Sequence, residues 1–212
     1  GLMHPKWRPS TNWKKKLSPF KQQNNNALFS PDTTVFWFRR DLRLTDNAGL
    51  YHALKENEHV IPLFIFDTEI LQKLEDKADR RVEFIHKTLQ HLKTQLEERG
   101  SSLVILFGNP VQLFDKVVAK SVYTNRDYEP YARQRDSSVQ HILEQRGISF
   151  KVLKDQVIFD RNEVLKEDCK PYTIFTPYIR KWKSQLTKFH IKSYPTEKYF
   201  KNFQKSEPLG FP

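Results

Sequence analysis

The stretch "TTVFWFRRDLRLTDNAGL" (residues 33–50) joins an apolar run to a dense group of charges. Residues 33–38 have the β-branched and aromatic composition of a buried strand. Arg39, Arg40 and Asp41 follow at once, before the next helical pattern begins. Open α/β sheets bind their ligands at the carboxyl ends of their strands. The charges therefore predict a ligand site where this first strand opens into a loop.

Further apolar runs follow, and helical patterns separate them. The clearest helical pattern repeats apolar residues every three or four positions and stops at Gly100. Regular alternation of strands and helices predicts right-handed βαβ units, and hence an α/β fold with a doubly wound, five-stranded parallel sheet and helices on both faces. The predicted strands are residues 33–38, 59–66, 101–107, 121–125 and 149–159, and the predicted helices are 47–57, 79–99, 111–120 and 131–146.

The net charge of +11 is concentrated in the two ends of the chain. Residues 1–31 carry +6 and no acidic residue, residues 32–150 carry −1, and residues 151–212 carry +6. Basic flanks suit contact with nucleic-acid phosphates, and they equally suit flexible, well solvated termini. Charge alone leaves both interpretations open.

Composition also predicts how the chain is divided. Residues 1–31 contain "KKK" and "KQQNNN" and no periodic apolar face, which is typical of a disordered extension. Pro177 is placed to begin a helix late in the chain. The predicted divisions are a disordered basic extension (1–31), the α/β domain (32–160), a C-terminal loop and helix of that domain (161–190) and the start of an interdomain linker (191–212).

Cysteine content and hydropathy predict the compartment. Cys169 is the single cysteine, so the chain forms no internal disulfide. No apolar run approaches the roughly 20 residues that span a membrane, and residues 1–16 lack the apolar core of a signal peptide. We therefore expect an intracellular, cytoplasmic protein without a membrane partner.

Several common catalytic and binding motifs are absent from the sequence. None of the six glycines forms GxGxxG or GxxxxGK[ST], and no GxSxG elbow is present. The seven histidines show no metal-ligand spacing. We identify no catalytic residue and no metal ligands from the sequence.

Polar residues follow four of the predicted strands. Parallel strands point the same way, so these residues converge on one edge of the sheet, where arginines, carboxylates and aromatic rings suit a planar, polar heterocycle. The alternative is that they form structural ion pairs at the strand ends. We interpret Arg43 and Asp46 as structural, with Asp46 capping the first helix. The convergent residues are Arg39, Arg40, Asp41, Asp67, Glu69, Gly108, Asn109, Asn125, Arg126, Asp127 and Glu129.

The motifs themselves resemble the DNA photolyase/cryptochrome family. The resemblance rests on "FWFRRDLRLTDNAGL" (36–50), "VIPLFIFD" (60–67), "NRDYEPYARQRD" (125–136) and "PYTIFTPYIRKWK" (171–183), in matching order and spacing. It runs from about residue 33 to residue 185 and covers only the family's N-terminal α/β domain, which binds a light-harvesting antenna chromophore. The helical domain that binds FAD and docks the lesion lies further on in relatives.

This resemblance implies a function for the whole protein. We expect the N-terminal domain of a deoxyribodipyrimidine photolyase, an enzyme that repairs pyrimidine dimers by light-driven electron transfer from FAD. The isolated chain is then inactive, and its partners are its own helical FAD domain and, in the full-length protein, damaged DNA. The alternatives are a signalling cryptochrome without repair activity and a stand-alone nucleotide- or flavin-binding module.

The resemblance also indicates the antenna. Deazaflavin-binding members carry carboxylates where Asp127 and Glu129 stand, with Asp67 and Arg81 near the site. Folate-binding members of the bacterial type carry an Asn–Glu pair where this chain has Tyr131 and Ala132. We therefore expect a deazaflavin or flavin rather than a folate, with FAD bound only by the helical domain.

Each candidate residue has an expected role at this site. Asp127 and Glu129 accept hydrogen bonds from the ring of the chromophore, while Arg39 and Arg81 face its polar tail or brace the carboxylates. Trp37 and Phe66 are apolar walls, unless strand alternation buries either ring in the core. The full candidate set is Trp37, Arg39, Arg40, Phe66, Asp67, Arg81, Asn125, Asp127 and Glu129.

Overall fold

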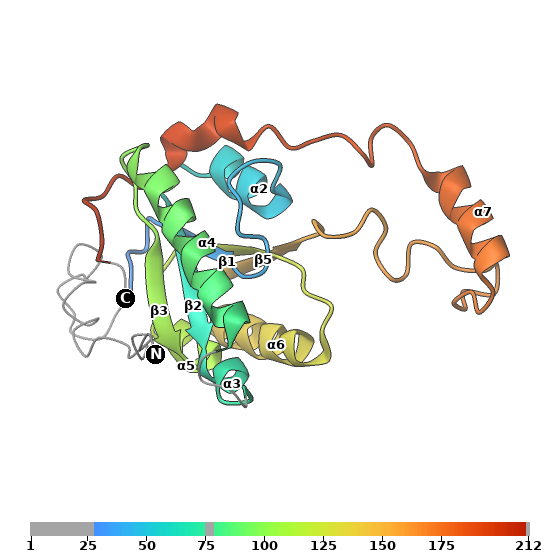
Figure 1. Cartoon of the computed structure of the whole chain (residues 1–212), viewed down its shortest axis with the longest axis horizontal. Helices are drawn as coiled ribbons and strands as arrows, with labels where there is room; N and C mark the ends of the chain where they lie inside the picture. Colours follow the sequence, from blue (N-terminus) through green and yellow to red (C-terminus); the bar gives the residue numbers. More distant parts are fainter. Residues whose placement is uncertain (1–27, 75–78, 211–212) are drawn as a thin grey trace, which may run out of the picture.

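A parallel five-stranded sheet forms the centre of the computed structural model, which describes residues 28–74 and 79–210 (Figure 1). The chain builds from β1 outward to β3 and then crosses back to β4 and β5, so the predicted doubly wound α/β fold is confirmed. The spatial order is β3-β2-β1-β4-β5, with β1 at Thr34–Phe38, β2 at Val60–Asp67, β3 at Val104–Gly108, β4 at Ser121–Asn125 and β5 at Ser149–Leu153.

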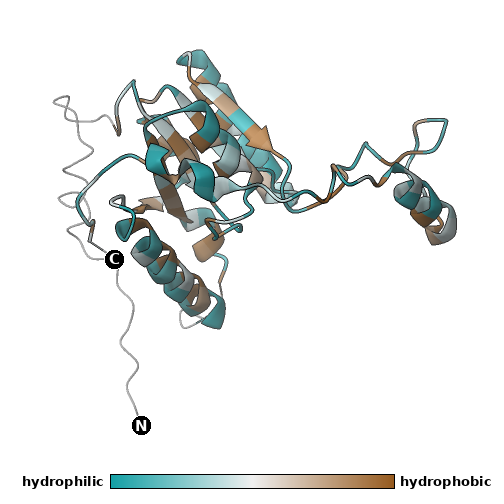
Figure 2. Ribbon diagram, turned by 90° about the horizontal axis from the view of Figure 1, so that it is seen from above, coloured by the Kyte–Doolittle hydropathy of each residue, from teal (hydrophilic) through white to brown (hydrophobic). Residues whose placement is uncertain are grey.

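Helices cover both faces of the sheet because successive strand residues point to opposite sides. Trp37 of β1 packs with residues of α5 (Pro110–Phe114) and α6 (Pro130–Gln145) on one face. Phe36, its neighbour, packs with residues of α2 (Ala48–Glu56) and α4 (Arg80–Glu97) on the other. Figure 2 shows brown, hydrophobic positions on the central strands between the helices. None of the described helices is long and apolar enough to cross a membrane.

Several elements differ from the sequence prediction, and one of them is β5, which ends at Leu153 rather than at residue 159. A short helix, α3 (Thr68–Leu71), follows β2 directly, where none was predicted. The helix predicted over residues 111–120 ends at Phe114, since Val117 and Ala119 are buried in the core and Val117 pairs with Leu28. Those contacts require an extended backbone, and they override the local helical pattern.

The N-terminal boundary also differs from the prediction. The expected disordered extension covers residues 1–31, of which 1–27 lie outside the described residues. Leu28 donates its backbone N–H to the carbonyl of Lys116 over 2.8 Å, and Phe29 is buried in the core with 2% exposure. Residues 28–31 therefore belong to the α/β domain, because Phe29 fills a place in its core.

The residues expected to begin a linker, 191–212, instead return to the α/β domain as far as they are described. We call residues 196–210 the strap. It opens with the 3₁₀ helix η2 (Thr196–Asn202), which lies against α2 (Figure 1). Phe203 and Leu209 are buried, and the backbone N–H of Gln204 donates to the carbonyl of Val60 over 2.8 Å. Apolar burial at these two residues explains why the strap is held against the domain.

The C-terminal helix was expected within residues 161–190 as a part of the α/β domain. The structure forms it as α7 (Phe175–Gln185), which stands away from the sheet at the end of two extended segments (Figure 1). We call residues 154–194 the arm. Inside the arm, the ring of Phe159 lies 5.5 Å from that of Trp182 on α7. The arm is thus folded on itself, while its helix contributes no buried residue.

Candidate functional site

The candidate site lies between β1 and β4, where the order in which the chain adds strands to the sheet reverses. These strands are neighbours in the sheet, but the chain leaves β1 toward β2 and leaves β4 toward β5. Such a switch point opens a crevice at the carboxyl ends of the two strands. Trp37 pairs with Thr124 in the register, so Arg39 and Asn125 meet at this edge.

Side-chain amides form a buried hydrogen-bond network at the switch point. The side-chain amide of Asn125 donates to the carboxylate of Asp41 and, over 2.8 Å, to Oδ1 of Asn47. Its own Oδ1 accepts the backbone N–H of Gly49 over 2.7 Å. A Cβ atom on Gly49 would lie 2.5 Å from that oxygen and 2.9 Å from the ring of Phe36. Only glycine fits here, and Asn125 serves the fold.

A chain of charges extends from β1 across α6 to β2. Arg39 donates through Nη1 to both carboxylate oxygens of Asp136 over 2.6 Å. Asp136 also accepts from Arg135, whose Nη1 lies 3.4 Å from the Oδ2 of Asp67. The same oxygen of Asp67 accepts the Tyr131 hydroxyl over 2.8 Å. The predicted residues Arg39 and Asp67 are therefore joined through two residues of α6.

Burial determines the electrostatics of this chain of charges. The side chains of Arg39, Arg135 and Asp67 are each 5–6% exposed, and that of Asp136 is 13% exposed. Two arginines balance two aspartates, as desolvated charges require. Burial, followed by the hydrogen bond to Asp67, raises the pKa of Tyr131 above its ordinary value. Its hydroxyl therefore stays protonated and donating at neutral pH.

Both aromatic candidates lie in the hydrophobic core. Trp37 is 1% exposed and packs against Phe114 with 4.8 Å between ring centroids. The guanidinium carbons of Arg39 and Arg135 lie 5.0 and 4.9 Å from its ring. Phe66 is 5% exposed and lies in the core on the opposite face. Strand alternation thus buries both rings, the alternative considered for them.

A second set of candidates lies at the surface, and we call Arg40, Asp127 and Glu129 the open group. Nη1 of Arg40 is 3.5 Å from an oxygen of Asp127 and 3.5 Å from an oxygen of Glu129. The side chains of Arg40 and Glu129 are 57% and 66% exposed, whereas that of Asp127 is 9% exposed. Ion pairs of this length are weak, and the pair between Arg40 and Glu129 is also exposed on both sides. A ligand could therefore displace them at little cost.

Arg81 lies apart from these two sets. It is on the first turn of α4, where its Nε donates to the carboxylate of Asp79 over 3.0 Å. Its side chain is 76% exposed. The structure shows a local ion pair, and the expected approach of Arg81 to the chromophore remains a prediction.

Arg43 and Asp46 are structural, as expected, but the role predicted for Asp46 is wrong. Asn47 caps α2, accepting the backbone N–H of Leu50 over 3.0 Å. Asp46 has a φ of 48° and accepts the backbone N–H of Tyr194, at the end of the arm, over 2.8 Å. The Asp46 carboxylate therefore holds the end of the arm, while Asn47 caps the helix.

The sequence interpretation did not select three residues of the charge chain: Arg135, Asp136 and Tyr131. A signal was present, since Ala132, Arg135, Val139 and Leu143 form the buried face of α6. A buried arginine on an otherwise apolar helical face needs a carboxylate partner, because an unpaired buried charge is costly. The pattern therefore predicts a buried ion pair.

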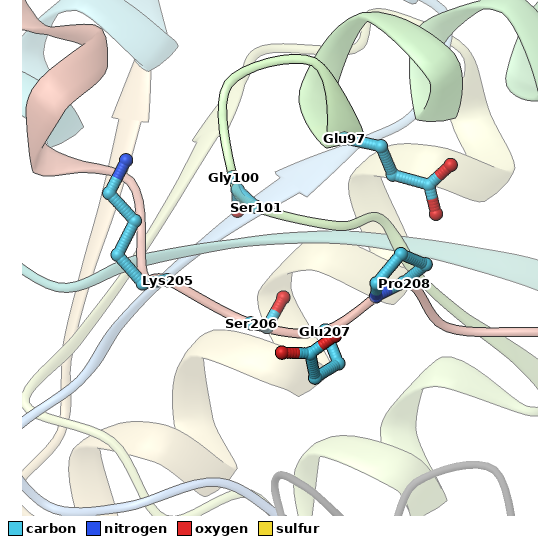
Figure 3. Close-up of a pocket in the computed structure, with 7 residues that line it drawn as sticks. All are labelled: Glu97, Gly100, Ser101, Lys205, Ser206, Glu207 and Pro208. Carbon is cyan, nitrogen blue, oxygen red and sulfur yellow. The ribbon is translucent and has the colours of Figure 1, made fainter.

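The structure also has a cavity of about 450 Å³ at the opposite edge of the sheet. It lies between the turn that joins α4 to β3 and the strap (Figure 3). Its lining is Glu97, Gly100, Ser101, Lys205, Ser206, Glu207 and Pro208. The amino ends of the strands lie at this edge, so the cavity is separate from the candidate site.

The fold and the switch point define a Rossmann-like α/β domain with a polar site at the carboxyl edge of its sheet. The family model described as DNA photolyase matches residues 34–198, which is most of the chain. The chain therefore belongs to the DNA photolyase family.

Individual relatives agree with this assignment. The chain is 38% identical over 155 residues to a deoxyribodipyrimidine photo-lyase of a Synechococcus sp., covering 71% of this chain and 32% of the relative. It is 32% identical to cryptochrome-2 of Arabidopsis thaliana, covering 70% and 25%. A crystal structure of the Sulfolobus tokodaii photolyase superposes with a TM-score of 0.60 at 33% identity, covering 70% and 34%. The chain thus spans about a third of the length of such relatives.

Proposed function

We propose that this chain is the N-terminal, antenna-binding part of a DNA photolyase that repairs pyrimidine dimers together with a helical FAD-binding domain. The family match over residues 34–198 carries the proposal, because it includes the switch point and the arm. Photolyases among the relatives support repair rather than signalling as the activity. The helical domain corresponds to the length of the relatives that this chain does not cover.

The open group supplies the contacts to the chromophore in this proposal. Asp127 and Glu129 accept hydrogen bonds from N–H groups of a planar ring, and Arg40 turns to the polar tail. The two carboxylate acceptors fit the ring N–H of a deazaflavin or flavin. The existing contacts of Arg40 are long and weak, so a ligand can replace them. When bound, the chromophore absorbs light and passes the excitation to FAD.

A flavin has further support from one relative. The Sulfolobus tokodaii photolyase is described as containing two FAD molecules, with the implication of a novel light-harvesting cofactor. Tyr131, which stands in place of the Asn of folate-binding members, donates to buried Asp67. Its hydroxyl is already committed to the fold, which argues against a folate contact at this position.

Ligand titration tests the proposed site. A deazaflavin, FMN, FAD and a reduced folate are each titrated into the chain and followed by fluorescence. Loss of one hydrogen bond to a charged acceptor costs about 1.5–3 kcal/mol, or roughly 10- to 150-fold in affinity. We expect Asp127→Ala and Glu129→Ala each to weaken deazaflavin or flavin binding by that factor. Glu98→Ala, at the end of α4, removes a carboxylate that is 67% exposed, close to the 66% of Glu129, and should change nothing.

A chimera extends the titration to the complete enzyme. It joins this chain to the helical remainder of the Synechococcus sp. photo-lyase, the relative with 38% identity. We expect FAD to copurify with the chimera and not with this chain alone, and only the chimera to repair thymine dimers in light. Folate binding that neither carboxylate variant affects, in the chain and in the chimera, would contradict the chromophore and its site.

A further inference from the structure

The cavity at the amino edge of the sheet is formed jointly by the strap and the turn that joins α4 to β3 (Figure 3). Lys205, Ser206 and Pro208 line it from the strap, and Gly100 and Ser101 line it from the turn. Its volume of about 450 Å³ falls in the range of small-molecule sites, roughly 300–1,000 Å³. The cavity is therefore large enough for a ligand that touches both segments.

Two buried hydroxyl groups at this cavity lack a hydrogen-bond partner among the described residues. Ser101 is 1% exposed, and neither its Oγ nor the buried Oγ of Ser206 makes a hydrogen bond within that part of the chain. Figure 3 shows the Ser206 hydroxyl directed from the strap toward the turn. A buried hydroxyl without a partner costs free energy, so most buried hydroxyls in folded proteins are bonded. The two serines therefore indicate a ligand that supplies the missing hydrogen bonds.

The other polar groups of the lining add acceptors and a donor. The hydrogen bonds that Glu97 accepts within the described chain use its Oε1, so its Oε2 can accept another. Glu207 adds a second carboxylate from the strap. The Lys205 ammonium donates to the carbonyl of Arg99 over 2.8 Å and has further protons to donate. The cavity therefore offers carboxylates, hydroxyls and an ammonium to a ligand.

This lining restricts the chemistry of the ligand. Two carboxylates oppose an anion, and the ammonium of the lining already donates to a carbonyl. The described residues include no group of three His, Cys, Asp or Glu side chains that could hold a metal ion. Pro208 is the only apolar side chain among the lining residues, so an apolar ligand would leave both hydroxyls without partners. A neutral ligand rich in hydroxyl groups fits, because each hydroxyl both donates and accepts.

We propose that this cavity binds a small polyhydroxy compound, either a monosaccharide or an acyclic polyol, which share this chemistry. Its hydroxyls donate to Glu97 and Glu207 and accept from Ser101 and Ser206. The bound compound joins the strap to the turn, since each segment supplies part of the lining. Binding therefore stabilises the strap against local opening. The proposal is independent of the proposed function, because the cavity lies at the opposite edge of the sheet from the candidate site.

Titration followed by NMR tests the class of ligand. D-Glucose, sorbitol and inorganic phosphate are each titrated into the chain, and the backbone amide signals of Gly100, Ser101 and Ser206 are monitored. We expect saturable shifts with glucose or sorbitol and none with phosphate. The tighter binder of the two distinguishes a cyclic from an acyclic ligand. As a control, 2-(hydroxymethyl)tetrahydropyran keeps the ring of glucose without its ring hydroxyls and should produce no shift.

Two serine variants locate the site. Ser101→Ala and Ser206→Ala each remove one hydrogen bond to the ligand, which should weaken binding by roughly 2- to 12-fold. Ser184→Ala, which removes an exposed hydroxyl on the arm, should leave binding unchanged. Without ligand, Ser101→Ala should not lower the urea midpoint of the chain, since the lost hydroxyl has no partner among the described residues.

Hydrogen exchange tests the link between the ligand and the strap. The backbone N–H groups of Gln204 and Leu209 donate to the carbonyl of Val60 and the hydroxyl of Ser102, so their exchange reports opening of the strap. The ligand must dissociate before the strap opens. At about ten times the dissociation constant of the bound polyol, we therefore expect this exchange to slow by about tenfold.

Three results would overturn the proposal. One is the lack of saturable shifts with either polyol. Another is polyol binding that neither serine variant weakens, which would place the ligand at a different surface. The third is phosphate binding in preference to both polyols, which would assign the cavity to an anion. Binding that leaves the exchange of Gln204 and Leu209 unchanged would contradict the link to the strap.

Discussion

Arg39 and Arg40 are neighbours in the first charged stretch, but one is buried in an ion pair and the other is exposed. Arg39 turns inward to pair with buried Asp136, whereas Arg40 turns outward and contacts Asp127 only at 3.5 Å. The sequence placed both at the correct edge, since each follows a parallel strand. It could not distinguish them, because the buried partner of Arg39 lies 97 positions further on. Long-range pairing, not local pattern, decides which charge remains available.

A second charged cluster at the residue scale gives a pH-dependent prediction. Oε2 of Glu56 accepts the Tyr123 hydroxyl and the Lys151 ammonium, each over 2.7 Å. Burial raises the pKa of this carboxyl, but hydrogen bonds from Lys151, Tyr123 and His52 together outweigh it and lower the pKa from 4.5 to about 2. The folded state thus favours the carboxylate. Its stabilisation is complete above pH 4.5 and is lost as the pH falls toward 2.

Urea unfolding of the chain and of Glu56→Gln measures this contribution. The side chain is 40% exposed, so solvent screening reduces the expected loss to about 1 kcal/mol at pH 7. The difference between the two proteins should shrink at pH 3 and below. An equal difference at both pH values would show that the variant acts through packing rather than through charge.

At the scale of elements, the strands were easier to predict than their connections. All five strands follow from apolar runs, whereas Asn109, predicted as a polar residue of the candidate site, caps the helix that begins at Pro110. The end of α5 at Phe114 could not be predicted, because the pairing of Val117 with Leu28 sets it. The same holds for the candidate site. Asp127 and Glu129 could be predicted because they directly follow a strand, whereas Arg135 lies on a helix and was not predicted.

Asp155, at the start of the arm, contacts the first residue of α2, and this contact gives a prediction about the stability of that helix. Asp155 is 3% exposed in its side chain, accepts the backbone N–H of Ala48 over 2.9 Å and pairs with Arg43. It therefore acts as a second cap of α2 from the root of the arm. We expect Asp155→Ala to lower the free energy of unfolding by about 1–3 kcal/mol, as the loss of a cap and a buried acceptor implies.

Urea unfolding monitored by circular dichroism tests the role of Asp155. Asp168→Ala serves as the control, since Asp168 lies on the arm and its side chain is 52% exposed. We expect no change from the control beyond about 0.5 kcal/mol. Equal effects of the two variants would contradict the capping role and leave α2 dependent on Asn47 alone.

At the scale of the whole molecule, the division of the chain was the least predictable feature. Residues 191–212 show little apolar periodicity, which predicts a linker. Composition does not predict whether a flanking segment packs against the sheet or extends away from it. The strap returns because Phe203 finds a place beside Val60, and the arm departs although its composition resembles that of the strap.

Removal of the strap tests its assignment to the α/β domain. Phe203 is 1% exposed and Leu209 is 7% exposed, and burial of two such side chains stabilises a domain by roughly 3–6 kcal/mol. We expect the free energy of unfolding of a chain that ends at Tyr194 to be lower by that amount, with a midpoint at a lower urea concentration. Its m-value should fall as well, because less surface becomes exposed on unfolding.

Single substitutions separate this burial from the effect of shortening the chain. Phe203→Ala leaves a cavity in a packed site and should cost about 3–5 kcal/mol on its own. Phe189→Ala, on the arm with 81% exposure, should change the unfolding free energy by less than about 0.5 kcal/mol. If residues 196–210 were a linker, both substitutions would change the unfolding free energy by the same small amount. A large loss at Phe203 alone would therefore extend the α/β domain through the strap.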